Sequence, residues 1–402
     1  MAIIGLFAVA LLATAAVQLT VTESAMQQNA QAGTQALYMA DQGLSRYFQS
    51  WSPGSNLSGP LDLITVIDTT DGEIDTSQVL ADFGGGDLKS SDIVLGETTV
   101  RITPSKVMLS PVGDLYQVEA TSTIIDPRPN RPPAVRSLRS YAQMDPPIAI
   151  RAALMAPGGL YAFKGNSNRI VLKGNKKVKC GVSTSVPGLA TPAGVYDYKD
   201  AKKRDIGQSV NGVGHDSSTA SYEELRDSLH YNWSQLSNAA TYVNVPNSIV
   251  IPRDYPSLTA IPFKNFSKAG FWPVILVQGD LNITSGKETK GFGMLVVTGS
   301  LNVKNGVLKW DGLVLTGGRL TVVDGKDESH THIKGAVAAG LGCVTNGDVA
   351  SGKCRVELGA DTKKDGEGEH LGVDFSLCNV EASVMGMMML RPVTPTRHLR
   401  LY

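Results

Sequence analysis

The chain has no excess of charge of either sign. Lys and Arg total 37 and Asp and Glu total 37 among 402 residues, so the charges cancel. Nucleic-acid binding depends on a positive field, and the neutral composition therefore excludes nucleic acid as a partner. The motifs of phosphate-binding loops, serine hydrolases and zinc proteases are also missing. We predict that the chain is not an enzyme.

Charge and proline are both absent from the N-terminus. No charged residue precedes Glu23, no proline precedes Pro53, and Met1–Val17 is almost wholly apolar. About 20 apolar residues cross a bilayer, so this run predicts a segment that can lie in a membrane. A cleaved secretory signal is the alternative, because residues 13–15 (Ala-Thr-Ala) imitate a cleavage site, although a basic stretch before the apolar run is missing.

One helix is predicted from this run to about residue 50. Apolar or small residues recur at steps of four and three, which places them on one side of a helix. They are Met26, Ala30, Gly33, Leu37, Ala40, Leu44, Tyr47 and Trp51. A helix of 50 residues is about 75 Å long. We assign residues 1–52 to this helix, whose apolar residues include Ile3, Leu6, Phe7, Leu11, Leu12, Val17, Met26, Leu37 and Leu44.

Short segments in which apolar and polar residues partly alternate follow the helix. They are residues 97–102, 115–125 and 134–142, and proline- or glycine-containing stretches separate them. This pattern predicts an antiparallel sheet of consecutive strands in the region 53–145. The proline-rich residues 126–133 should form an exposed hairpin loop, because proline is excluded from helices and central strands.

Three similar blocks in the last third of the chain indicate an internal repeat. They are residues 274–283, 294–303 and 313–322. Their central glycines are 20 and 19 residues apart, at Gly279, Gly299 and Gly318. This spacing predicts one coil of a β-solenoid per repeat. Each glycine would turn a corner, and Leu281, Leu301 and Leu320 would stack inward.

The predicted solenoid extends beyond these blocks. A fourth coil is predicted at residues 333–337 and an earlier one at 169–178, with a helical excursion at 221–236 between them. We assign residues 146–402 to a β-solenoid-like region that ends in a helix. The predicted fold class is α+β, mainly β, with a long N-terminal helix, an antiparallel sheet and a C-terminal β-solenoid.

Cysteine is scarce, and no two cysteines form a C-x-x-C pair. The four are Cys180, Cys343, Cys354 and Cys378. In an exported chain this even number indicates two disulfides, for which three pairings exist. We predict Cys343 with Cys354, which flank a short polar stretch that a hairpin could close. Cys180 with Cys378 would then join the first coil to the final helix across almost the whole solenoid.

Two stretches of the sequence resemble a known family. The uncharged start followed by Glu23 and Ala36–Leu44 (ALYMADQGL), together with the ending Asp374–Ala382 (DFSLCNVEA), resembles the type IV pilins, in particular the PilX-like group. The resemblance implies a structural subunit of a type IV pilus-like filament, in which residues 1–52 lie in the membrane or the filament core. It implies that the apolar residues named above for this helix, from Ile3 to Leu44, are its assembly residues. It implies copies of the chain and the pilus assembly machinery as partners. The implied location is the inner membrane before assembly and an extracellular filament on the cell surface afterwards.

One position departs from the family. Major pilins usually carry a glutamate near the start of the mature helix, and if Met1 is the mature start this position holds Gly5. Minor and tip pilins often lack that acid. A minor or tip-located pilin or pseudopilin is therefore an alternative to a main subunit.

Two clusters contain metal-ligating residue types. His330 and His332 alternate along an extended stretch and could hold a metal ion. Asp361 and Asp365 lie in a glycine-containing acidic stretch whose oxygens could bind Ca²⁺. A solvated loop is the preferred interpretation of both, and no cofactor is predicted. A membrane-anchored carbohydrate-binding or carbohydrate-active β-solenoid protein, which would need converging acids or a metal, is the alternative from a different functional class.

Overall fold

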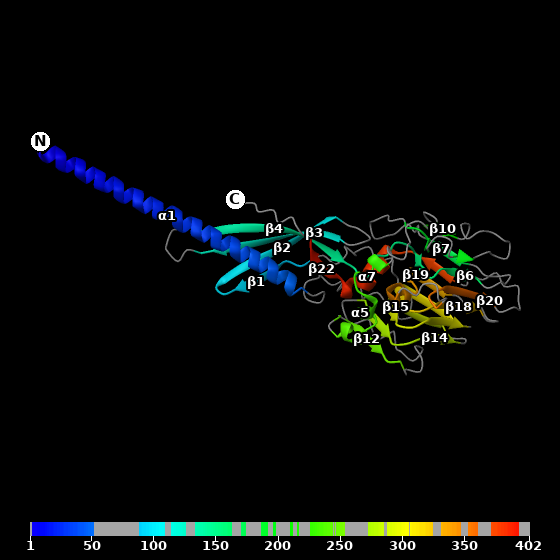
Figure 1. Cartoon of the computed structure of the whole chain (residues 1–402). Helices are drawn as coiled ribbons and strands as arrows, with labels where there is room; N and C mark the ends of the chain where they lie inside the picture. The colour runs from blue at the N-terminus through cyan, green and yellow to red at the C-terminus, as the bar shows by residue number, and fades with distance from the viewer. Residues whose placement is uncertain are drawn as a thin grey trace, which may run out of the picture.

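The chain is mainly β, with one long N-terminal helix, an antiparallel sheet and parallel sheets (Figure 1). The computed structural model describes residues 2–51, 88–108, 114–125, 133–162, 170–173, 186–191, 196–197, 210–211, 215–216, 226–243, 245, 247–253, 272–284, 288–304, 306–324, 331–346, 353–360 and 371–393. For some of these, including 2–10 and 170–173, only the backbone is described. The α+β, mainly β class predicted from the sequence is confirmed at this level.

Five of the described strands form the antiparallel sheet, in the order β1-β2-β3-β4-β22. Their bounds are β1 Ser91–Leu95, β2 Thr98–Met108, β3 Asp114–Ile124, β4 Ala134–Asp145 and β22 Met389–Pro392. The predicted antiparallel succession is confirmed in β2, β3 and β4. The sequence did not predict β1 or β22, and β22 adds the end of the chain to the sheet by pairing with β4. The predicted loop at 126–133 lies almost wholly outside the described residues.

Helix α1, Ala2–Gln49, is continuous over 48 residues. Its second half lies along the antiparallel sheet, and its first half projects away from the rest of the molecule (Figure 1). Ala40, Leu44 and Tyr47 are buried in a core shared with the sheet. At Gly43 the helix approaches the sheet so closely that a Cβ would lie 2.6 Å from Val100 Cγ1. A small residue is therefore required there.

The other strands form two parallel sheets. The larger has the order β10-β7-β21-β19-β17-β15-β13-β12, with β5, β8 and β11 off this path, and the smaller has the order β14-β16-β18-β20-β6-β9. Bounds in the larger are β5 Leu154–Met155, β7 Ile170–Lys173, β8 Leu189–Ala190, β10 Val210–Asn211, β11 His215–Asp216, β12 Ser248–Ile251, β13 Val274–Val277, β15 Glu288–Val297, β17 Val307–Thr316, β19 Thr331–Ala338 and β21 Leu371–Asp374. Bounds in the smaller are β6 Leu160–Ala162, β9 Tyr196–Asp197, β14 Leu281–Thr284, β16 Leu301–Lys304, β18 Leu320–Asp324 and β20 Val356–Ala360.

The sequence repeat sets the register of both parallel sheets. Each of the three blocks supplies residues to one strand of each sheet. Leu281, Leu301 and Leu320 lie in register across the smaller sheet and are buried. The predicted fourth coil, at 333–337, lies within β19 and pairs with β17. Moving one repeat along the sequence therefore moves from one strand to the strand paired with it in the same sheet.

The early segment at 169–178 contributes β7, and its remaining residues lie outside the described part of the chain. β7 pairs with β21, beyond the last repeat, and not beside β13. The final helix begins only three residues after β21, so β7 lies beside the strand that leads into this helix. Cys180 lies outside the described residues, so the reach of a Cys180–Cys378 link stays a prediction.

The single helix predicted at 221–236 is interrupted within its described part, where residues 226–227 and 233–236 are helical and residues 228–232 are not. Leu229 pairs with Ile148 in an isolated antiparallel bridge, and this long-range contact interrupts the local pattern. A new helix, α5 Trp233–Leu236, begins after Asn232, whose side chain accepts a hydrogen bond from the Ser234 amide. A tertiary contact has here overridden helix propensity.

Helix α7, Leu377–Val384, contributes to two hydrophobic cores formed by the described residues. Leu377, Val380 and Val384 pack in the core of the parallel sheets. Cys378 and Ala382, on another side of the helix, pack in the core that contains α1 and the antiparallel sheet. A 3₁₀ turn, η6 Met385–Met387, then leads into β22. The helix thereby connects the antiparallel sheet to the parallel sheets.

A column of glycines crosses three of the parallel strands. Gly293, Gly312 and Gly335 lie in register on β15, β17 and β19, and all three have positive φ. A Cβ on Gly312 would lie 2.3 Å from the Gly293 carbonyl oxygen and 2.3 Å from Ser383 Oγ of α7. Glycine therefore permits both the bend of the strands and the close approach of α7.

Gly312→Ala should destabilise the fold by about 3 kcal/mol or more, because the new Cβ meets the backbone of β15 and the side chain of Ser383 at once. Gly96 is the matched control, since its φ is +62° and nothing lies within 4 Å of where a Cβ would be. Gly96→Ala carries backbone strain alone, about 1 kcal/mol. The urea midpoints of the two variants, followed by circular dichroism, check this. Equal losses in both would contradict the role of the glycine column.

Candidate functional site

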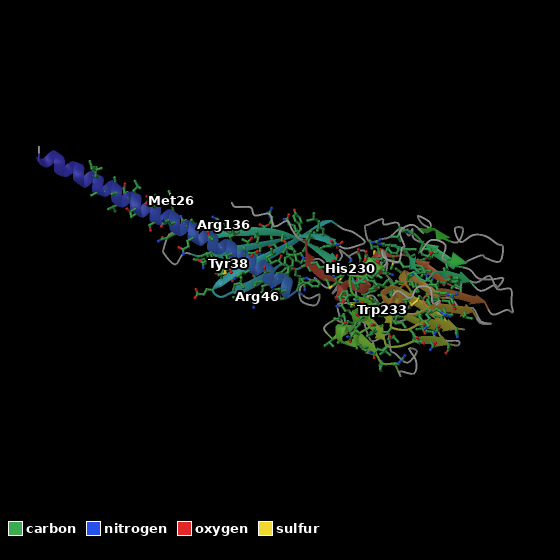
Figure 2. The ribbon with its side chains drawn as sticks, in the orientation of Figure 1. Met26, Tyr38, Arg46, Arg136, His230 and Trp233 are labelled. Carbon is green, nitrogen blue, oxygen red and sulfur yellow. A yellow bond between two sulfur atoms is a disulfide. The ribbon has the colours of Figure 1, made fainter. Side chains whose placement is uncertain are left out.

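The first half of α1 carries the largest uncovered apolar surface among the described residues. Every side chain from Leu11 to Ser24 is exposed. The large apolar residues include Leu11, Leu12, Val17, Leu19, Val21 and Met26, each more than 60% exposed. Figure 2 shows Met26 on the projecting part of the helix, beyond the end of the sheet. An apolar patch of this extent marks an interaction surface.

These side chains do not form a single stripe. Leu12, Leu19 and Met26 are spaced by seven residues and lie on one side of the helix. Val17 and Val21 lie about 180° around it, at 100° per residue. A helix that is apolar on all sides is normally surrounded by other apolar groups. Contact with one flat partner would leave one of these sides in water.

Three of the predicted assembly residues, Ile3, Leu6 and Phe7, lie where only the backbone is described. Leu11, Leu12, Val17 and Met26 are exposed on the projecting half. Leu19 and Val21 are equally exposed but were not among the predicted residues, although their spacing from Leu12 and Val17 could have identified them. No helix in the described part of the chain is both long enough and apolar enough to cross a lipid bilayer.

The second half of α1 packs on the sheet from Gly33 onward. Gly33, Ala36, Ala40, Gly43, Leu44 and Tyr47 are buried. Met26 and Ala30, at the start of the predicted apolar line, are exposed, and the line is buried only from Gly33 onward. Leu37, another predicted assembly residue, is half-buried. The contact surface follows the smallest residues, since they allow the helix to approach the strands.

Two features fix the ends of this contact. At its N-terminal end the Arg136 side chain of β4 packs against Gly33, 2.9 Å from where a Cβ would be, and Figure 2 shows Arg136 beside α1. At its C-terminal end Tyr47 is buried, and burial raises its pKa to about 12. The phenol therefore stays neutral, which suits a hydroxyl buried in an apolar contact.

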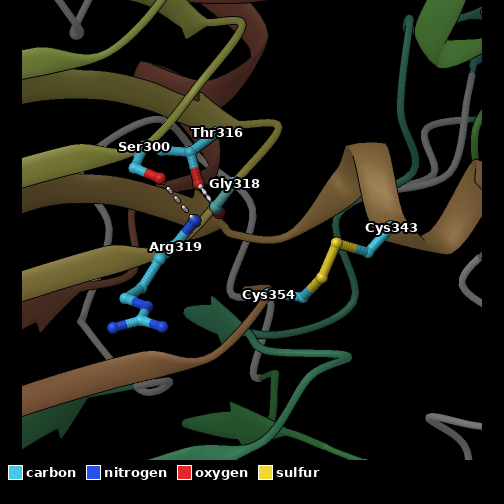
Figure 3. Close-up of a disulfide and its surroundings, with 6 residues drawn as sticks. All are labelled: Ser300, Thr316, Gly318, Arg319, Cys343 and Cys354. Carbon is cyan, nitrogen blue, oxygen red and sulfur yellow. Dashed lines mark hydrogen bonds between the residues drawn. A yellow bond between two sulfur atoms is a disulfide. The ribbon is translucent and has the colours of Figure 1, made fainter. Parts of the chain in front are cut away.

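The described cysteines are all disulfide-bonded. Cys343 is joined to Cys354 with their Cα atoms 6.1 Å apart (Figure 3). The expected hairpin is wrong, because Cys343 lies in helix α6, Leu341–Asn346. Close to this disulfide, the Arg319 amide donates to Ser300 Oγ of the preceding repeat, and Thr316 Oγ1 donates to the Gly318 carbonyl within the same turn (Figure 3). Cys378 is buried in α7, and Cys180 lies outside the described residues, so their pairing stays a prediction.

The predicted metal candidates are not brought together in the part of the chain that the structure describes. His332, on β19, lies with its Nε2 3.8 Å from Asp374 Oδ2 of β21. His330, Asp361 and Asp365 lie outside the described residues. Among described side chains, no three His, Cys, Asp or Glu residues form a group that could hold a metal ion.

Comparison with known proteins finds no related protein. No family model, curated protein or solved structure matches the chain. The function therefore has to be argued from the residues and the geometry described above.

Non-reducing peptide mapping checks the cysteine assignment. We expect one linked peptide pair containing Cys343 and Cys354 and a second containing Cys180 and Cys378, because the first pair is bonded and Cys378 is bonded as well. Reduction should separate both pairs. A peptide linking Cys343 to Cys180, or free thiols at Cys378, would contradict the assignment.

Proposed function

We propose that the chain is a structural subunit of an extracellular type IV pilus-like filament, and that it assembles with copies of itself through the first half of α1. The observation that carries this proposal is the division of one 48-residue helix into two parts. The second part is packed on the subunit's own sheet, and the first part is apolar and uncovered. Such a helix stabilises an assembly only if neighbouring copies cover it.

The geometry of the uncovered half of α1 favours a core of many helices over a two-helix dimer. Apolar side chains on opposite sides, such as Leu12 and Val17, need cover from more than one direction. A bundle of parallel helices contributed by many copies provides this, and so does the lipid of the inner membrane before assembly. The pilus assembly machinery would transfer the helix from the one environment to the other.

The stretch that resembles type IV pilins has a structural explanation in this chain. Ala36, Ala40, Gly43 and Leu44 fall within Ala36–Leu44, and these four are its buried residues. The spacing of small residues therefore serves the contact of the helix with its own sheet. The resemblance and the packing support the same division of the helix.

We further propose that the two parallel sheets are faces of one β-solenoid, displayed on the outside of the filament. The support is that neighbouring strands in both sheets are one sequence repeat apart, as in Leu301 and Leu320. Coiling of the chain would produce this spacing. The β-solenoid would then be the part of each subunit that faces the surroundings.

A minor or tip-located pilin is the second candidate. The observation that favours it is Gly5, which stands where major pilins usually carry a glutamate, if Met1 is the mature start. Labelling the subunit in intact filaments separates the two roles. Label along the whole length supports a main subunit, and label only at the ends supports a minor one.

A charge placed in the uncovered half should prevent assembly. Val17→Asp would place a carboxylate in an apolar core, at a cost of several kcal/mol for each copy. Gln42→Glu is the matched control, because Gln42 is exposed on the sheet-packed half of the same helix. Filament yield measured by electron microscopy and sedimentation should be lost in Val17→Asp and kept in Gln42→Glu. A chain without its first 25 residues should remain a soluble monomer, and filaments from that chain would overturn the proposal.

A further inference from the structure

One strand of the smaller parallel sheet carries a glycosylation motif on its outer face. Residues 282–284 (Asn-Ile-Thr) have the N-x-S/T pattern at which an oligosaccharide is attached to asparagine. They lie in β14, where Asn282 and Thr284 are exposed and Ile283 is buried. Alternate residues of a strand point to the same face, so the amide and the hydroxyl of the motif both face outward.

The motif also lies at one end of this sheet. β14 is the last strand in the order of the smaller sheet, and Asn282 is in register with Asn302 of β16. Asn302 Nδ2 donates a hydrogen bond to Asn282 Oδ1, 2.9 Å away. Because the carboxamide oxygen of Asn282 faces β16, its Nδ2 is turned away from β16, toward the edge of the sheet. In the described part of the chain no residue accepts a hydrogen bond from this nitrogen, which is the atom that carries the sugar in a glycosylated asparagine.

A third exposed side chain precedes the motif. Asp280 stands two residues before Asn282, and its Oδ1 accepts a hydrogen bond from the Ser300 amide at 2.7 Å, which holds the turn before β14. Asp280, Asn282 and Thr284 are all exposed, while the two residues between them are buried. An acid, an amide and a hydroxyl are therefore presented together, and an enzyme can contact all three from one side.

The motif at residues 232–234, also described by the structure, has a different geometry. Asn232 Oδ1 accepts a hydrogen bond from the Ser234 amide, and the Asn232 amide donates to Gln235 Oε1. The chain turns here into helix α5, so this motif is not extended and its carboxamide oxygen caps the helix. The motifs that begin at Asn56 and Asn265 lie outside the described residues.

We propose that Asn282 is an N-glycosylation site, a proposal that rests on the proposed extracellular location of the chain. A transferase joins Asn282 Nδ2 to the anomeric carbon of an oligosaccharide carried on a lipid diphosphate. The bond from that carbon to the diphosphate oxygen breaks, the lipid diphosphate leaves with the oxygen, and one amide proton passes to a basic group of the transferase. The product keeps Oδ1, so it can still accept the hydrogen bond from Asn302.

A glycan at this position would shield the end of the smaller sheet. An edge strand offers backbone groups with which a strand of another chain can pair. A bulky, hydrated sugar on β14 blocks that pairing and leaves α1 free to assemble. Filaments of Asn282→Gln should therefore form more side-by-side bundles in electron micrographs than wild-type filaments. Equal bundling of the two would contradict the shielding role.

Mass spectrometry of peptides from the full chain, isolated in detergent from the cells that naturally produce it, tests the site. We expect the Asn282 peptide to carry the added mass of an oligosaccharide and the Asn232 peptide to carry none. Thr284→Val removes the hydroxyl and keeps the branched shape, so it should abolish the modification, while Thr284→Ser should keep it. Asn302→Gln is the matched control, because Asn302 lies in the same outward row but is followed by Lys304 where the motif needs a hydroxyl. This variant should leave the modification of Asn282 unchanged.

Two further variants test the geometry. Lys304→Thr gives Asn302 the same motif on an inner strand, where its Nδ2 is already hydrogen-bonded, so Asn302 should stay unmodified. Asp280→Asn keeps the acceptor for the Ser300 amide and removes the charge, which should lower the modified fraction of Asn282. Asn282 found wholly unmodified in the wild-type chain would overturn the proposal, whether or not filaments form. Modification that survives Thr284→Val would overturn it as well. A glycan on Asn282 in a chain that forms no filaments would support this site and count against the proposed function alone.

Discussion

The exposed apolar half of α1 is the constraint on which the rest of the structure depends. Six of its large apolar side chains are more than 60% exposed. Burying such a side chain contributes about 1.5–3 kcal/mol, so leaving all six in water costs roughly 10 kcal/mol. This is comparable to the whole stability of a typical domain. In the proposed filament, neighbouring copies or lipid supply the contacts that this half of α1 lacks.

In the proposed assembly, α1 must also stay firmly attached to the rest of its own chain. Small residues such as Ala40 and Gly43 bring the second half of α1 close to the antiparallel sheet. α7 then continues the same core and enters the core of the parallel sheets. Force applied to α1 therefore reaches the parallel sheets through packed side chains. Strand β22, which follows α7, adds a backbone connection to the same sheet.

Local and periodic features of the fold could be predicted from the sequence, and long-range ones could not. The period of the helix, the alternation in β2 to β4 and the register of Leu281, Leu301 and Leu320 depend on neighbours in the sequence or on the repeat. The place of β7 beside β21, and of β22 beside β4, depends on pairing between distant segments that carry no local signal. The Leu229–Ile148 bridge ended a predicted helix for the same reason. In the candidate site the apolar residues were predicted, but the point at which the sheet begins to cover them was not.

Imaging of assembled full-length chains at side-chain resolution tests the central claim most directly. The account predicts that residues 11–26 of α1 are surrounded on all sides by the same helix from several neighbouring copies, with the antiparallel and parallel sheets outside this core. It also predicts that Gly33 to Tyr47 keep their contact with the subunit's own sheet. An assembly held together by the β-sheet parts, with the first half of α1 still exposed, would contradict it.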